Sequence, residues 1–303
     1  MPAQLRAVRA RISAVKSIAK ITRAQELIAS SRIIRAQQRS RDAGPYAREL
    51  TQAVEAVVTR STSIDHPMIT EPERVSRAAL LIITSDSGFC GPYNANVLRE
   101  AARLRERNSR SQVTSTIYVT GQKGIAWHRF RNIATEREWH GFSTQPTYAN
   151  AEAVAAPLLE AYQRPVAEGG VDEIYIVSTE FISMLTQRPV VRRMLPLRIE
   201  DRPGERPGGP LPAYEFEPNT DVVLDALLPQ YVASRVYFAM LEAAASELAA
   251  RRRAMKAATD NANELLDNLT REANNARQAE ITQEISEIVG GANALAGANT
   301  ESE

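Results

Sequence analysis

One short segment brings hydroxyl, carboxyl, thiol and glycine groups together: Ser85-Asp86-Ser87-Gly88-Phe89-Cys90-Gly91. It follows an apolar run of strand length and precedes a helical pattern, where a phosphate-binding loop would lie. It lacks both the GxGxxG spacing and a Gly-Lys-Ser/Thr ending, so a structural turn is favoured over a nucleotide site. Cys90 has no Lys, Arg or His within three residues, which favours a buried structural thiol over a nucleophile.

Other reactive residue types are sparse or spaced for a surface. The chain has three histidines: His66, His128 and His140. None pairs with another or with Cys90 at a ligand spacing, so no metal site is predicted. Glu280, Glu284 and Glu287 recur at helical spacings, which is typical of a solvated face. We therefore expect no catalytic residue, cofactor or metal, and a nucleotide-binding α/β enzyme remains only a rival hypothesis.

Charge is distributed unevenly along the chain. Residues 1–41 hold ten Lys or Arg and one acid, whereas residues 278–303 hold five Glu and no basic residue. The basic residues include a stripe along one helical pattern: Arg9, Lys16, Arg23, Arg32, Arg35 and Arg39. Such a stripe suits nucleic acid, acidic loops of a partner protein, or a merely solvated surface. It has no interleaved aromatic residues for base stacking, so nucleic acid is not preferred.

These groups would be positioned by two long terminal helices. Apolar residues step by three and four over residues 3–58, which indicates an amphipathic helix. The expected seam contains Leu5, Val8, Ile12, Val15, Ala19, Thr22, then Ile18, Ile21, Gln25, Ile28, and later Ala43, Ala47, Leu50, Val54, Val57. Gly44-Pro45 predicts a kink rather than a break, because the periodic pattern resumes at once.

The last ninety residues, from about Tyr214, predict a second helix. A heptad stripe runs through Leu248, Met255, Ala262, Leu269, Ala276, with Ala258, Leu265, Ala273 in the second seam position. A further run is out of phase with it, which predicts a stutter near residues 276–281: Ile281, Ile285, Ile288, Ala292, Leu295. Residues 229–296 alone would extend on the order of 100 Å, so this helix needs a partner helix or an enclosing protein.

The middle of the chain alternates strand and helix patterns, which predicts an α/β unit with a mainly parallel sheet. Expected strands are 78–84, 113–120 and 172–179, with a possible edge strand at 189–197, and expected helices are 93–107, 122–131 and 150–163. The predicted fold is therefore a long antiparallel coiled coil of the terminal helices plus a central Rossmann-like α/β domain. Its predicted parts are helix 1–60, linker 61–76, α/β domain 77–200, Pro/Gly-rich loop 201–213 and helix 214–303.

Composition sets the compartment and the relation to membranes. A single cysteine permits no intrachain disulfide and favours a reducing compartment. No apolar run approaches the roughly 20 residues of a membrane span, so membrane attachment is expected only through partners. The Arg-rich start imitates a mitochondrial presequence, but its periodicity continues well beyond the length of one.

Several segments together resemble the gamma subunit of rotary F-type ATP synthases. They are the helix 18–29, the turn Ser85–Asn94, the start of the last helix at Tyr214-Glu215-Phe216-Glu217-Pro218, and two C-terminal signatures, Arg251–Asn263 and Asn275–Ile285. Their order and spacing fit nearly the whole chain. Two positions depart from the family pattern: Gln25 stands in place of Met, and Ser87 in place of Arg.

The resemblance implies the central rotor shaft of a proton-translocating ATP synthase, with the chemistry left to the catalytic beta subunits. Implied partners are three alpha and three beta subunits, the epsilon subunit and the ring of c subunits. The implied beta-subunit contacts are Arg251, Gln278, Thr282, Glu284, Lys16, Lys20 and Arg23, and the implied contacts with the c ring and epsilon are Tyr214, Phe216 and Glu217. The implied location is peripheral, at the cytoplasmic face of a bacterial plasma membrane. The alternative is a basic coiled-coil protein that binds nucleic acid.

Overall fold

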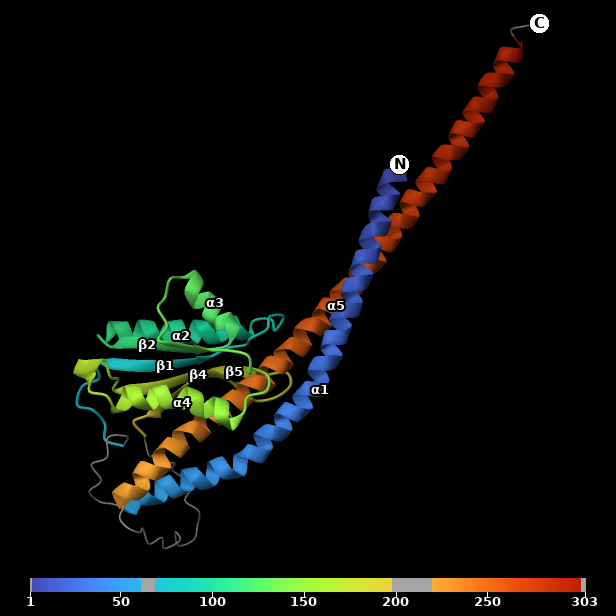
Figure 1. The fold of residues 1–303 in the computed structure, drawn as a ribbon. Helices are drawn as coiled ribbons and strands as arrows, with labels where there is room; N and C mark the ends of the chain where they lie inside the picture. The colour runs from blue at the N-terminus through green and yellow to red at the C-terminus, as the bar shows by residue number, and fades with distance from the viewer. Residues whose placement is uncertain (1, 61–68, 198–219, 301–303) are drawn as a thin grey trace. The chain divides into compact units, whose positions relative to one another are not determined.

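The computed structural model describes residues 2–60, 69–197 and 220–300. By internal contacts the chain forms two compact units, one of Met1–Ile28 with Arg253–Glu303 and the other of Ala29–Arg252 (Figure 1). The predicted contact residues Tyr214, Phe216 and Glu217 lie outside the described residues, as do the loop 201–213 and the first half of the linker, residues 61–68. The proposed division into five parts therefore stays a prediction.

Two helices of unusual length begin and end the described chain. Helix α1 spans Pro2–Arg60 and helix α5 spans Thr220–Thr300. Helix α1 passes through Pro45 without a break, in line with the periodicity on both sides of it. The fold class is confirmed: long terminal helices accompany a five-stranded α/β sheet.

The seam of α1 follows one continuous heptad, and part of its predicted course is wrong. Its buried and half-buried positions step by three and four: Leu5, Val8, Ile12, Val15, Ala19, Thr22, Glu26, Ala29, Ile33 and Ala36. Ile18, Ile21, Gln25 and Ile28 are instead exposed. The reason is the phase of the heptad: alternating steps of three and four from Leu5 reach residues 19, 22, 26 and 29, so polar Thr22 and Glu26 occupy the seam.

In the unit formed by the two chain ends, α1 and α5 lie side by side and antiparallel (Figure 1). The Thr22 and Thr259 hydroxyl oxygens are 2.7 Å apart although 237 residues separate them along the chain. Met255, Ala262 and Leu269 are buried on the α5 side, as the heptad predicted. Leu265 is 41% exposed and does not belong to the seam. The half-buried Leu266 takes that position.

The helix pair ends before α5 does. Half-buried positions continue through Ala276 to Glu280, and every residue from 281 to 290 is exposed. Among the described residues nothing covers Ile281, Ile285 and Ile288, so the expected stutter near them stays a prediction. The side chains of Ala292 and Leu295 lie outside the described part.

The second unit contains a sheet of strand order β3-β2-β1-β4-β5. The strands are β1 Arg77–Ile83, β2 Thr114–Thr120, β3 Arg137–Trp139, β4 Glu173–Phe181 and β5 Gln187–Leu195. Neighbouring strands are parallel except for β5, which runs antiparallel to β4 as an edge strand. Strand β3 was not predicted, because three residues are too short to show an alternating pattern.

Apolar side chains alternate between the two faces of the sheet. Leu80 and Ile82 of β1 face α2, Tyr93–Arg110, and α3, Gln122–Phe130. Leu81 and Ile83 face α4, Tyr148–Gln163, and the part of α5 around Val232 to Ala243. Helix α5 therefore packs in two different surroundings. Its first part completes the core of the α/β domain, and its later part pairs with α1.

Between those two parts, α5 is enclosed on all sides. Every residue from Ala243 to Arg251 is buried, as expected for a helix surrounded by other elements. Ala245, Leu248 and Ala249 pack with Ile33 and Ala36 of α1. In the described part of the chain, no helix is long and apolar enough to cross a membrane.

Candidate partner-binding surface

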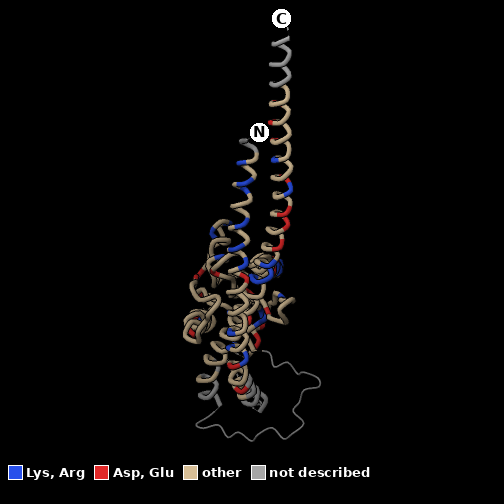
Figure 2. Tube along the Cα trace, turned by 90° about the vertical axis from the view of Figure 1, so that its right-hand side faces the viewer, with Lys and Arg blue, Asp and Glu red and all other residues tan. Residues whose placement is uncertain are grey.

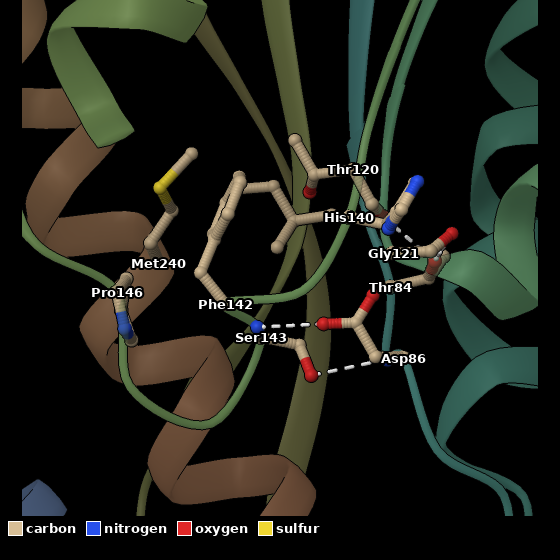
Figure 3. Close-up of a pocket in the computed structure, with 10 residues that line it drawn as sticks. Thr84, Asp86, Thr120, Gly121, His140, Phe142, Ser143, Pro146 and Met240 are labelled. Carbon is tan, nitrogen blue, oxygen red and sulfur yellow. Dashed lines mark hydrogen bonds between the residues drawn. The ribbon is translucent and has the colours of Figure 1, made fainter. Parts of the chain in front are cut away.

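The carboxyl edge of the parallel sheet is where α/β folds usually bind ligands. Here Asp86, just beyond β1, accepts backbone N–H bonds from Gln122 at 3.1 Å and from Gly141 at 2.9 Å. It also accepts one from Ser143 at 2.9 Å (Figure 3). Burial raises the pKa of this carboxyl, but the amide bonds from Ser143, Gly141 and Gln122 outweigh burial, and the pKa lies below its ordinary value. Asp86 thus joins the ends of β1, β2 and β3 to one another.

The hollow at this edge is too small for a nucleotide. Its lining includes Asp86, Gly121, Phe142 and Met240, and its volume is about 10 Å³, room for at most one water molecule (Figure 3). Met240 of α5 closes one side. The groups that could cradle a phosphate are used by the chain itself, which agrees with the predicted structural turn.

Cys90 and His128 also have structural roles. Cys90 is 2% exposed, and burial raises the pKa of its thiol, with a hydrogen bond between Cys90 and Ser85 offsetting part of that rise. His128 donates from Nδ1 to the Gly124 carbonyl at 2.8 Å, and burial lowers its pKa. Across the residues that the structure describes, no cluster of three His, Cys, Asp or Glu could hold a metal ion.

Arg251, a predicted beta-subunit contact, points into its own chain. It is 8% exposed, and its guanidinium donates to the Ser87 carbonyl at 3.0 Å and to the Gly88 carbonyl at 3.2 Å. Its third partner is Glu247 one turn earlier, at 2.7 Å. Arg251 thus belongs to the junction between α5 and the turn after β1, and a contact with another subunit stays a prediction.

The predicted basic contacts lie on the outside of the helix pair. Lys16, Lys20 and Arg23 are exposed and lie at helical spacings of four and three, so they share one flank of α1 beside its seam. Figure 2 shows basic positions repeating along this part of α1. Arg23 also pairs with Glu26 at 2.8 Å, an i,i+3 pair beside the seam. Lys16 and Lys20 therefore carry most of the positive charge that this flank offers to a partner.

The predicted C-terminal contacts share α5 with a bare apolar stripe. Gln278 and Thr282 lie one turn apart, and the Thr282 hydroxyl donates to the Gln278 carbonyl at 2.9 Å. Ile281 and Ile285 lie three and seven residues after Gln278, on the same face, and are 45% and 56% exposed. Glu284 is exposed but lies on another face. The structure thus groups Gln278 and Thr282 with isoleucines that have no partner within the described chain.

Two features of the structure were not predicted from the sequence. Glu247 is fully buried, and burial raises its pKa, with Arg251 opposing that rise. A single acidic residue in an Ala-rich helix did not by itself suggest burial, but its i,i+4 spacing to Arg251 could have indicated the ion pair. The second feature is the Thr22 and Thr259 contact, which no single-sequence pattern could pair across 237 residues.

Comparison with known proteins places these features in context. A family model described as ATP synthase matches residues 4–295. The ATP synthase gamma chain of Acidothermus cellulolyticus is 56% identical over 99% of this chain and 100% of its own length. That of Thermobifida fusca is 54% identical over the whole of both chains. A chain in the cryo-EM structure of the Euglena gracilis mitochondrial ATP synthase covers 97% of this chain and 95% of its own length, with a TM-score of 0.68 and 18% identity, which shows likeness of fold.

Proposed function

The chain belongs to the ATP synthase gamma-chain family, and from that premise we propose that it is the central rotor shaft of a rotary ATP synthase. The observation that carries the proposal is the antiparallel pairing of the two chain ends, with α5 continuing bare beyond its partner. A slender helix pair that exposes isoleucines along one face suits an element enclosed by other subunits.

The shaft acts by unequal contact. Three copies of a beta subunit around one asymmetric helix pair each meet a different face, so each is held in a different conformation. Turning the shaft exchanges these faces, and the ligand equilibrium at each catalytic site shifts by the difference in contact free energy. The chain itself performs no chemistry, in keeping with the turn at the sheet edge, whose polar groups are already engaged.

The proposed partners are three alpha and three beta subunits around the helix pair, with the epsilon subunit and the c ring beyond. Lys16, Lys20 and Arg23 would face acidic loops of the beta subunits. Gln278 and Thr282 would hydrogen-bond to beta-subunit loops, and Glu284 would contact them from its own face of α5. We place the complex at the cytoplasmic face of a bacterial plasma membrane, held there through the c ring and translocating protons.

Reconstitution tests this function. The isolated chain should show no ATP hydrolysis and no saturable nucleotide binding, and it should restore coupled ATP synthesis only when alpha, beta and the membrane sector are present. Nucleotide binding by the chain alone would favour the enzyme hypothesis. Strong salt-sensitive DNA binding by the native complex would favour the nucleic-acid hypothesis.

A residue-level test uses matched glutamines. Gln278→Leu should impair coupled synthesis and leave the fold intact, because the exposed amide lies on the face that we assign to the beta subunits. Gln283→Leu is the control, since Gln283 is exposed and bonds to Glu287 of its own helix at 2.9 Å. Normal synthesis by Gln278→Leu, or an equal loss in both variants, would remove the contact assignment.

A further inference from the structure

Beyond the apolar core that packs Val232 to Ala243 against the sheet, polar contacts join the α/β domain to α5 at residues 242–251, where the turn 85–91 meets the helix. Three contacts outside the Arg251 cluster join the same segment of α5 to the domain. The Tyr93 hydroxyl donates to the Ala243 carbonyl at 3.2 Å, and the Ser246 hydroxyl donates to the Thr179 carbonyl at 3.3 Å. Arg192 of β5 pairs with Glu242 at 3.0 Å.

The turn 85–91 is held in shape by hydrogen bonds within the α/β domain, independently of α5. The Ser85 hydroxyl donates to the Ser87 carbonyl at 2.8 Å, and the Asn94 side chain accepts from the Ser85 amide at 3.0 Å. Phe89 and Gly91 have φ values of 59° and 56°, in the left-handed region, so the chain reverses sharply here. This reversal directs the Ser87 and Gly88 carbonyls toward α5.

Arg251 matches this turn in shape and charge. A planar guanidinium can bridge two neighbouring carbonyls and a carboxylate at once, which a lysine ammonium cannot do with the same geometry. Glu247 is fully buried and holds the guanidinium from within the same helix. Because a buried charge without its partner is costly, Glu247 and Arg251 keep each other in place.

From these contacts we propose that Arg251 is a latch, set by Glu247 and closed on the Ser87 and Gly88 carbonyls, that transmits torque between the α/β domain and α5. The inference rests on the proposed rotor function. Under that function, force is used along the helix pair, and the part of it that the domain carries crosses the contacts that join the domain to α5. Arg251 is the last buried residue of the enclosed segment, immediately before α5 leaves for the helix pair.

The latch is first tested in the isolated full chain, without reference to function. Hydrogen exchange at the amides of residues 85–94 should accelerate by about tenfold to a hundredfold in Arg251→Met, the range expected for losing hydrogen bonds to a charged group. Arg253→Met is the matched control, because Arg253 is exposed two residues further on and should leave the turn protected. Unchanged exchange in Arg251→Met would overturn the latch.

Two milder variants keep the proposal testable if Arg251→Met does not fold. Glu247→Gln keeps an acceptor for Arg251 and removes the buried charge, so it should fold and loosen the turn by less than Arg251→Met does. Arg251→Lys should fall between Arg251→Met and the wild type, because an ammonium cannot bridge the two carbonyls in the same way. If Glu247→Gln loosens the turn as much as Arg251→Met, the carbonyl contacts are not the latch.

Torque transmission is then tested in the reconstituted membrane complex. Arg251→Met should lower ATP synthesis several-fold more than it lowers ATP hydrolysis by the detached catalytic sector, because only synthesis drives force across the junction. Ala250→Cys supplies a rescue, since Ala250 packs in one buried cluster with Cys90. In the Ala250→Cys, Arg251→Met chain, a disulfide to Cys90 formed with an added thiol oxidant should restore synthesis, and reduction of this disulfide should abolish synthesis again.

The outcomes separate the two proposals. A loosened turn with normal synthesis would refute the torque role and leave the rotor function standing. A disulfide that forms without restoring synthesis would show that Arg251 acts elsewhere, for instance on a beta subunit. Failure of the wild-type chain to support synthesis would instead refute the proposed function.

Discussion

The hydroxyl pair in the seam makes a quantitative prediction about how the chain ends are held in register. Thr22 and Thr259 are each 9% exposed, and their Oγ1 atoms are 2.7 Å apart. Each hydroxyl can also donate within its own helix, Thr22 to the Ala19 carbonyl at 3.1 Å and Thr259 to the Met255 carbonyl at 2.9 Å. One hydrogen bond therefore crosses the seam, and either residue can be its donor.

Replacing one hydroxyl by a methyl removes that bond without leaving the other unsatisfied. Thr22→Val should cost about 1 kcal/mol, the usual net value of a hydrogen bond, because Thr259 still reaches Met255. Thr259→Val should cost a similar amount. The double variant places two methyl groups together and should lie within about 0.5 kcal/mol of the wild type, since replacing both partners by apolar groups is nearly neutral. The expected coupling energy is therefore about 1.5 to 2.5 kcal/mol in magnitude.

Hydrogen exchange of the full chain measures these differences locally, which suits a chain of two units better than a global unfolding curve. Each single variant should exchange about fivefold faster than the wild type at seam amides near residues 19–26 and 255–262, from about 1 kcal/mol at 1.4 kcal/mol per tenfold. The double variant should exchange about as the wild type does. Additive effects in the double variant would refute a direct bond across the seam.

Three further predictions concern the seam, the apolar stripe and the sheet edge. Leu269→Ala should destabilise the helix pair by about 2 to 5 kcal/mol, and Leu265→Ala by under about 0.5 kcal/mol, because only Leu269 is buried; helix-pair protection in hydrogen exchange measures both, and equal effects would contradict the corrected seam. Ile281→Ser with Ile285→Ser should leave the thermal midpoint of the isolated chain unchanged and weaken assembly with alpha and beta subunits, measured by gel filtration; unchanged assembly would argue against enclosure of this face. The folded-state pKa of Asp86 is lowered, so its stabilisation is present above the ordinary value of 3.8 and is lost as the pH falls through the lowered pKa. The thermal midpoint of Asp86→Asn should thus lie below that of the wild type at pH 7 and approach it in acid, and a constant difference would contradict this role.

Much of the architecture could be predicted because it depends on periodicity. The heptad steps of Leu5 to Thr22 and of Met255 to Leu269 belong to regular helices whose buried side is set by geometry alone. The apolar run at residues 78–84 likewise predicted a buried parallel strand. These patterns need no knowledge of distant residues.

The errors arose where two phases of one pattern competed. Near residue 21, isoleucines on one phase and the small or polar Ala19, Thr22 and Glu26 on the other both fit a helix. Hydrophobicity favoured the isoleucines, but continuity of the packed seam selected the smaller residues. Apolar content alone therefore cannot identify the inner face of a helix whose outer face is also apolar.

The site was harder to predict because some of its residues bond within the chain while others are exposed to solvent. Arg251, Gln278 and Thr282 belong to similar C-terminal signatures, yet Arg251 bonds inward and the other two are exposed. Their difference depends on where the turn 85–91 meets α5, which is a long-range contact. Only coordinates reveal such a contact, since no local pattern records it.

Crosslinking the two chain ends tests the central claim, that they form one antiparallel shaft. Thr22→Cys with Thr259→Cys should form an intrachain disulfide, because the replaced oxygens lie 2.7 Å apart, whereas Thr22→Cys with Thr270→Cys should not, being displaced by about 16 Å along the helix. The complex assembled with the oxidised chain should still hydrolyse ATP and turn, since the linked helices move as one body. Absence of the first crosslink, formation of the second, or arrest of turnover by an intrachain link would contradict the account.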